Sequence, residues 1–169
     1  MGSNDLCLAC KSISSTTLLS PDVFEWNVRA ALERIRTKIP RVFVNLVGSF
    51  NVSQIYETTK DDRWCGLIRS IPFAFLECPC AFAFGEWGDG RRRKMDEISV
   101  MYNERLERIA RDYQRNKSDK SFAVVYDPST KGLHMKTFPI QVLSHHLLFI
   151  TIITILIFNF FYIKLVFSL

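Results

Sequence analysis

An asparagine near the start of the chain is the residue whose type and setting best suit chemistry. It lies in the run Gly2-Ser3-Asn4-Asp5, whose composition is typical of a turn beside a helix start. The side-chain amide of Asn4 can donate a hydrogen bond to an oxyanion that develops on a substrate carbonyl. Gly2 would let the neighbouring backbone take a conformation that other residues avoid. An Asn-Asp pair in a turn also serves as a simple cap, so the run by itself leaves both interpretations open.

The sequence indicates no serine paired with a general base near the Asn4 amide. Ser3 has no nearby base, and His134 lies in a polar turn where a histidine is usually solvated. His145 and His146 lack an aspartate three residues earlier, because a valine and a leucine stand there. A serine nucleophile needs a hydrogen-bonded base and a third group that orients it. We therefore assign a catalytic role to none of these residues.

The five cysteines offer a second kind of chemistry. They are Cys7, Cys10, Cys65, Cys78 and Cys80. A zinc site is one interpretation, although the second close pair has one intervening residue, whereas structural zinc motifs usually have about two to four. Disulfides are the other interpretation. The odd total leaves at least one cysteine unpaired within the chain, and the sequence alone does not give the pairing.

Signals of the cellular compartment conflict. The sequons Asn51-Val52-Ser53 and Asn116-Lys117-Ser118 matter only if the chain enters the secretory pathway. Paired cysteines would likewise suggest an oxidising compartment. Yet Met1 is followed at once by polar residues, so we expect no signal peptide.

The charge of the chain argues against a nucleic-acid partner. The formal net charge is a modest +5, and the one dense basic cluster is 91–94, which runs straight into Asp96 and Glu97. A nucleic-acid surface needs basic residues spread over a face with polar or aromatic readers among them. The cluster therefore predicts a solvated helix start or loop, with contact to a phosphate or lipid headgroup as the alternative.

Hydrophobic periodicity predicts alternating helices and strands. Ser20 and Pro21 are a good N-cap and first helical residue, and Pro40 ends the helix. A β-branched run at 42–47 predicts a buried parallel strand. The following loop, 48–64, has a short helical turn at 53–58, and 65–84 is an apolar segment with cysteines. Apolar residues of the first helix recur near a 3.6-residue period at Phe24, Val28, Ala31, Leu32, Ile35 and Ile39.

The second half of the body repeats the helix-to-strand order. Gly85, Gly88 and Gly90 predict a loop, and a second helix is expected from about Arg92 to Asn116. A strand follows at 122–126. This order is the pattern of an α/β domain. The apolar stripe of the second helix comprises Met95, Ile98, Tyr102, Leu106, Ile109 and Tyr113.

These features together resemble the SGNH, or GDSL, family of lipases and esterases, and most of all its membrane-associated phospholipase B branch. The resemblance rests on the run from Gly2 to Cys10, on the helix-to-strand junction 39–47, and on the Cys65…Cys78-x-Cys80 spacing. It extends over roughly residues 1–140. It implies a three-layer fold with a parallel sheet flanked by helices, disulfides in place of zinc, and no cofactor or metal. It also implies acyl-ester hydrolysis of phospholipids or lysophospholipids, with Asn4 as the oxyanion donor and Gly2 shaping its turn.

The chain departs from the family pattern at the reactive groups. The Gly-Asp-Ser motif that carries the family's nucleophile does not occur, and neither does the Asp-x-x-His motif that carries its acid and base. We therefore expect a fragment of a phospholipase B-like ester hydrolase that is inactive alone. The alternative is a membrane-tethered, non-catalytic binding or decoy protein.

The sequence ends in a long apolar stretch, so we expect the chain to consist of two parts. We expect a partial hydrolase domain at 1–141 and a hydrophobic tail at 142–169. The part from 147 to 169 is long enough for an apolar helix that crosses a membrane as a single C-terminal span, with Lys164 at the interface. Membrane localisation is the resulting prediction, in a family otherwise secretory or at the cell surface. The alternative is that this Ile-, Phe- and Asn-rich tail is translated AT-rich non-coding sequence.

Overall fold

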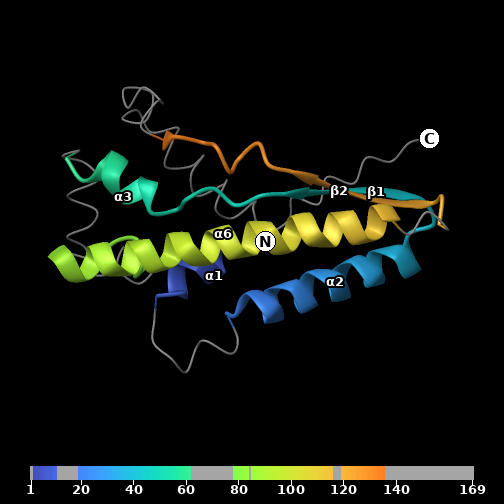
Figure 1. Cartoon of the computed structure of the whole chain (residues 1–169), viewed down its shortest axis with the longest axis horizontal. Coiled ribbons are helices and arrows are strands. Elements are labelled where there is room, and N and C mark those ends of the chain that lie inside the picture. The colour runs from blue at the N-terminus through green and yellow to red at the C-terminus, as the bar shows by residue number, and fades with distance from the viewer. Residues whose placement is uncertain (1, 11–18, 62–77, 84, 116–118, 136–169) are drawn as a thin grey trace.

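The long helix α6 lies between a small parallel sheet and two further helices (Figure 1). The computed structural model describes residues 2–10, 19–61, 78–83, 85–115 and 119–135. Strands β1 and β2 pair in parallel, with Val42 opposite Phe122 and Val47 opposite Asp127. The elements are α1 (Ser3–Leu8), α2 (Pro21–Lys38), β1 (Val42–Val47), α3 (Gln54–Thr59), α6 (Gly85–Arg115) and β2 (Phe122–Asp127).

The class is therefore α/β, as the sequence predicts. The described residues form a two-stranded sheet with α6 against one face. The fuller arrangement, a three-layer domain spanning 1–141 with helices on both faces, stays a prediction.

The first predicted helix is confirmed together with the signals that begin and end it. Ser20 is the N-cap, and its Oγ accepts a hydrogen bond of 3.2 Å from the backbone N–H of Val23. Pro21 occupies the first turn, where a missing N–H costs nothing. Ile39 is already extended, as expected of the residue before a proline. The apolar stripe packs inward through Phe24, Val28 and Leu32.

The strand predictions are also confirmed, with one difference in burial. Val42, Val44 and Leu46 are buried against the helices, as is Val124 on β2. The alternate residue Phe43 is 42% exposed, so β1 is half-buried among the described residues. Since successive side chains of a strand point to opposite faces, only one face is covered by α6.

The predicted start of the second helix is wrong. The glycine-rich run expected to form a loop is helical, and α6 begins at Gly85. Gly85 has φ 64 and opens the helix. Gly88 instead allows the helix backbone to lie close to Ala83, because a Cβ at position 88 would lie 2.1 Å from the carbonyl oxygen of Ala83. Gly88 thus reflects contact between two backbones, and not an interruption of the helix.

The expectation of a single C-terminal membrane span is corrected here. No helix within the described ranges combines the length and the apolar character needed to cross a bilayer. The stretch 147–169, on which the expectation rested, lies outside the described residues.

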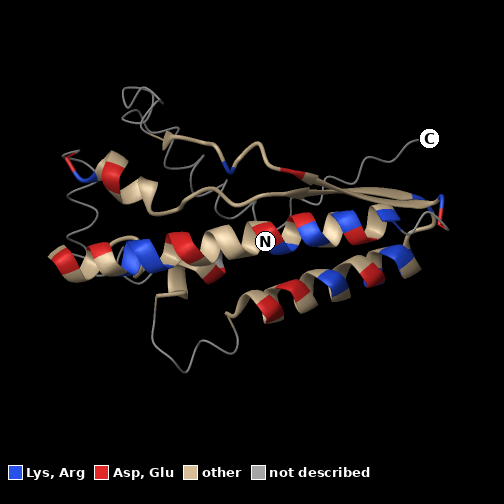
Figure 2. Ribbon diagram, viewed as in Figure 1, with Lys and Arg blue, Asp and Glu red and all other residues tan. Residues whose placement is uncertain are grey.

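Charged residues join α2 to α6. Glu25 of α2 is only 13% exposed and pairs with Arg29, Arg105 and Arg108. Arg29 in turn contacts Asp112 of α6 at 2.5 Å. Figure 2 shows acidic and basic residues interspersed along both helices. Burial opposes ionisation of Glu25, but hydrogen bonds from Arg108 and Arg29 outweigh it and lower the pKa of that carboxyl.

Replacement of Gly88 by alanine is expected to destabilise the fold. The new methyl group would clash with the Ala83 carbonyl, and overpacking of this kind costs about 1–3 kcal/mol. Gly90→Ala is the matched control, because the nearest atom to its Cβ would be 4.0 Å away and alanine favours helix by up to about 1 kcal/mol. Urea unfolding of both variants measures the difference. Equal stability of the two variants would contradict the close approach.

The ion pairs of Glu25 predict that the stability of the fold depends on pH. Because the folded-state pKa of Glu25 lies below its ordinary value of 4.5, its pairing stabilises the fold fully above that pH. The contribution is lost as the pH falls from 4.5 through the lowered pKa. Glu25→Gln is therefore expected to cost about 1 kcal/mol at neutral pH and to flatten the acid limb of the stability profile. Glu104→Gln, a change at an exposed residue of α6, should leave that limb unchanged in the same denaturation series.

Candidate functional site

Gly2 holds the start of α1 against the core. It is the N-cap of α1 with φ 105, in the left-handed region that favours glycine. Its carbonyl accepts a hydrogen bond of 2.9 Å from the N–H of Leu6. A Cβ at Gly2 would lie 3.2 Å from the ring of Phe24 and 3.3 Å from that of Tyr102. Both the backbone conformation and the close packing therefore require glycine here.

The residue expected to polarise a carbonyl lies in the first turn of that helix. Asn4 is part of α1, so the run after Gly2 is helical where the sequence predicted a non-helical turn. The side chains of Asn4 and Ser3 lie outside what the structure describes. Burial raises the pKa of the neighbouring Asp5 carboxyl. Burial also raises the pKa of Tyr102, with a further contribution from the negative charge of Asp5.

The start of α1 is level with the carboxyl end of β1. Tyr102, which packs on Gly2, is followed on α6 by Asn103, which binds Ser49, the second residue after β1. The Asn103 Oδ1 accepts from the Ser49 N–H at 2.7 Å, and its Nδ2 donates to the Ser49 carbonyl at 2.8 Å. In α/β sheets, ligands bind beside the carboxyl ends of the strands. The Gly2 turn thus lies at the height along α6 where such a site would form.

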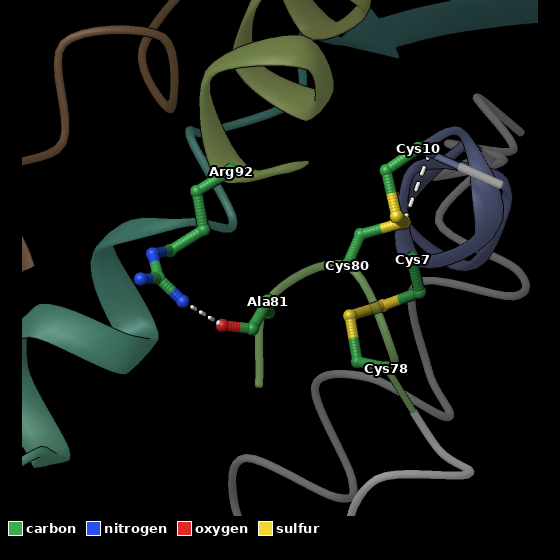
Figure 3. The surroundings of a disulfide bond; sticks show 6 residues. All are labelled: Cys7, Cys10, Cys78, Cys80, Ala81 and Arg92. Atoms are coloured by element: carbon green, nitrogen blue, oxygen red, sulfur yellow. Dashed lines mark hydrogen bonds between the residues drawn. A yellow bond between two sulfur atoms is a disulfide. The ribbon is translucent and has the colours of Figure 1, made fainter. Parts of the chain in front are cut away.

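Two disulfides fix α1 to the segment 78–83. Cys7 is bonded to Cys78 and Cys10 to Cys80 (Figure 3). The Cys80 N–H also donates to the Cys7 carbonyl at 3.2 Å. Because these four sulfur atoms are all in disulfides, none is a thiolate that could bind zinc, and the disulfide interpretation is supported. Cys65 lies outside the described residues.

A buried arginine joins the same segment to α6. Arg92 is 6% exposed, and its Nη1 donates to the carbonyl of Ala81 at 3.0 Å (Figure 3). The same Nη1 donates to the carbonyl of Ala83 at 2.7 Å. Its Nη2 contacts Asp89 at 2.5 Å, and its guanidinium lies 3.7 Å from the centroid of the Tyr56 ring. These partners satisfy a charge that would otherwise be costly to bury.

The prediction that the basic cluster is solvated is therefore wrong for Arg92. Arg93 and Lys94 are exposed, and Arg91 stacks over the Trp87 ring at 3.4 Å. The sequence held a signal for the difference, because Arg92 is three residues before Met95 and hence on the buried face of the helix. Since the helix was expected to begin only at about residue 92, that signal was missed.

Of the three histidines weighed as candidate bases, the structure describes His134. His134 is exposed in the turn after β2. His145 and His146 lie outside the described residues. Within the part of the chain that the structure describes, no group of three or more His, Cys, Asp or Glu residues could hold a metal ion.

Comparison with known proteins points to one class, the membrane-associated phospholipases. The chain is similar to "Phospholipase B1, membrane-associated" of Rattus norvegicus, at 26% identity over 137 residues, which is 80% of this chain and 9% of that protein. The Mus musculus protein of the same name is 26% identical over 147 residues, or 82% of this chain and 9% of its own length. The Homo sapiens protein is 25% identical over 138 residues, again 80% of this chain and 9% of the relative.

The matched region is thus a small part of each relative. This chain spans about a tenth of the length of the phospholipases it resembles. No family profile matches the chain, and no solved structure matches it. A phospholipase B-like relationship is supported, while membership of the wider SGNH family is an inference from the motifs.

The two disulfides should contribute to stability in a non-additive way. Each closes a loop of about 70 residues, which is worth about 4 kcal/mol in the chain-entropy estimate. While one remains, however, the other closes only a small ring, so each single Cys-to-Ser pair should cost about 2 kcal/mol and the double replacement about 6 kcal/mol. Denaturant unfolding without reductant tests this. Single costs that add up to the double cost would contradict the shared-loop arrangement.

Proposed function

We propose that this chain is part of a phospholipase B-like ester hydrolase of the SGNH type, acting on acyl esters of phospholipids or lysophospholipids. The observation that carries the proposal is the similarity to membrane-associated phospholipases over about four fifths of the chain. In this proposal Asn4 donates a side-chain hydrogen bond to the oxyanion, and Gly2 gives the backbone beside it the required left-handed conformation.

The geometry around α1 supports this role for the N-terminal turn. Gly2 packs on Tyr102 level with the carboxyl end of β1, and the two disulfides hold the rest of α1 in place. A donor that stabilises developing charge works best when it is held in place before the reaction, because it then needs no reorganisation at the transition state. A short helix alone would not provide such rigidity, since isolated helices below about 12–15 residues are marginal in water.

The reaction would proceed by nucleophilic acyl transfer. A serine hydroxyl, deprotonated by a histidine, attacks the acyl carbonyl, and the carbonyl oxygen becomes an oxyanion. The Asn4 amide stabilises that oxyanion, which collapses to an acyl-serine as the histidine gives its proton to the departing alcohol of the lipid. Water, deprotonated by the same histidine, then attacks the acyl-serine through a second oxyanion, and the acid and the free serine hydroxyl are released. Since Gly-Asp-Ser and Asp-x-x-His do not occur in the 169 residues, the serine and the histidine would come from another portion of the hydrolase.

The chain on its own is therefore expected to show no turnover of p-nitrophenyl acyl esters or lysophosphatidylcholine. Turnover should appear when it is combined with a second polypeptide that carries the Gly-Asp-Ser and Asp-x-x-His motifs of SGNH hydrolases. In that assembly Asn4→Ala should lower kcat about 10²–10³-fold, the usual effect of removing one oxyanion donor. Asn27→Ala, at an exposed residue of α2, is the matched control and should leave kcat unchanged.

Three outcomes would contradict the proposal in different ways. Turnover by the chain alone that Asn4→Ala abolishes would show that it contains its own nucleophile and base. An active assembly that is insensitive to Asn4→Ala would remove the oxyanion role. An assembly that forms and stays inactive with both motifs present would instead favour a non-catalytic binding protein.

A further inference from the structure

The first sequon lies in the loop after β1, and the proposed ester hydrolysis does not use it. Asn51 is partly exposed, whereas Val52 is 1% exposed and Ser53 8% exposed. The Asn51 carbonyl accepts a hydrogen bond of 3.1 Å from the N–H of Gln54, which opens α3. Asn51, the acceptor asparagine, is thus the accessible member of the sequon, whose other two residues are buried.

The backbone on both sides of Asn51 is fixed. Before it, two hydrogen bonds with Asn103, of 2.7 and 2.8 Å, hold Ser49 in place. After it, Val52 belongs to the hydrophobic core. Asn51 therefore occupies the outer part of a short, well-held loop, a position at which a bulky surface group adds no clash with the core.

The disulfides give independent support for the compartment in which such a group is added. Cys7–Cys78 and Cys10–Cys80 join segments 71 and 70 residues apart, and Cys78 and Cys80 are buried. Disulfides of this structural kind form and persist in oxidising compartments, including the lumen of the endoplasmic reticulum. Asparagine-linked glycans are attached in that same lumen.

We propose that Asn51 is a site of N-linked glycosylation, with a lipid-diphosphate-linked oligosaccharide as the co-substrate. The Nδ2 of Asn51 forms a bond to C1 of the first sugar, and the bond from C1 to the diphosphate oxygen breaks. The lipid diphosphate leaves, and the amide loses one proton to the medium, so that no oxidant or reductant is required. This inference does not depend on the ester-hydrolase proposal, and either can fail without the other.

The structure also orders the events. The Ser53 hydroxyl, which completes the sequon, donates to Asp96 Oδ2 at 2.7 Å and is buried between the loop and α6. A transferase that must reach this hydroxyl cannot do so once the loop has docked on α6. Transfer to Asn51 therefore precedes that docking.

The test directs the full chain, behind a cleavable signal sequence, into microsomes that contain the transferase and its lipid-linked donor. Wild type should give an Asn51 glycopeptide by mass spectrometry and a gel shift that amide-cleaving glycosidase reverses. Asn51→Gln and Ser53→Ala should lose that glycopeptide, whereas Ser53→Thr, which preserves the sequon, should keep it. Asn116→Gln is the matched control, because it removes the other sequon and should leave the Asn51 glycan in place.

A second arm tests the order of events. Folded, disulfide-bonded chain made without glycan is incubated with the same transferase and donor, and it should stay unmodified at Asn51. Modification of the folded chain as complete as that of the nascent chain would overturn the ordering. A protease-protected, disulfide-bonded wild-type chain with no glycan at Asn51 would overturn the site itself.

Discussion

The close approach between α6 and the segment 78–83 is the constraint on which the rest of the described structure depends. A glycine at position 88 lets the two backbones meet, and Arg92 then binds the carbonyls of Ala81 and Ala83. A side chain at position 88 would separate the segments, and the buried guanidinium would lose its partners. Since a buried charge without partners is very costly, the two features stabilise the structure only together.

Disulfide bonds link the segment 78–83 to the candidate site. The segment 78–83 is held to α6 by Arg92, and α1 is held to the segment by Cys7–Cys78 and Cys10–Cys80. On its other side α1 begins at Gly2, which packs on Tyr102 of the same long helix. The short helix that carries Asn4 is thus fixed at both ends to α6, which also supports the sheet. An oxyanion donor requires such rigidity. The same rigidity would suit a purely structural role for α1 equally well.

Much of the fold follows from local signals in the sequence. Ser20 with Pro21 determines where α2 begins, and Pro40 determines where it ends, because capping and proline geometry act within a few residues. The strands at 42–47 and 122–126 were likewise visible in their β-branched composition. The start of α6 was not, since Gly88, one of the glycines that usually mark a loop, serves here as a contact with Ala83 outside the helix. A pattern along the chain carries no information about which distant backbone lies beside it.

In the candidate site, too, some features follow from the sequence and others only from the tertiary structure. The sequence by itself determined the type of residue at the turn, a glycine followed by Asn4, and the presence of close cysteine pairs, because these are properties of neighbouring residues. Only the tertiary structure decided that Cys7 bonds to Cys78 and Cys10 to Cys80, and which carbonyls bind the buried Arg92. Disulfide partners depend on which surfaces meet after the chain has folded, here over separations of 71 and 70 residues. Spacing within a motif cannot specify that meeting, whereas the packing of α6 against its neighbours does.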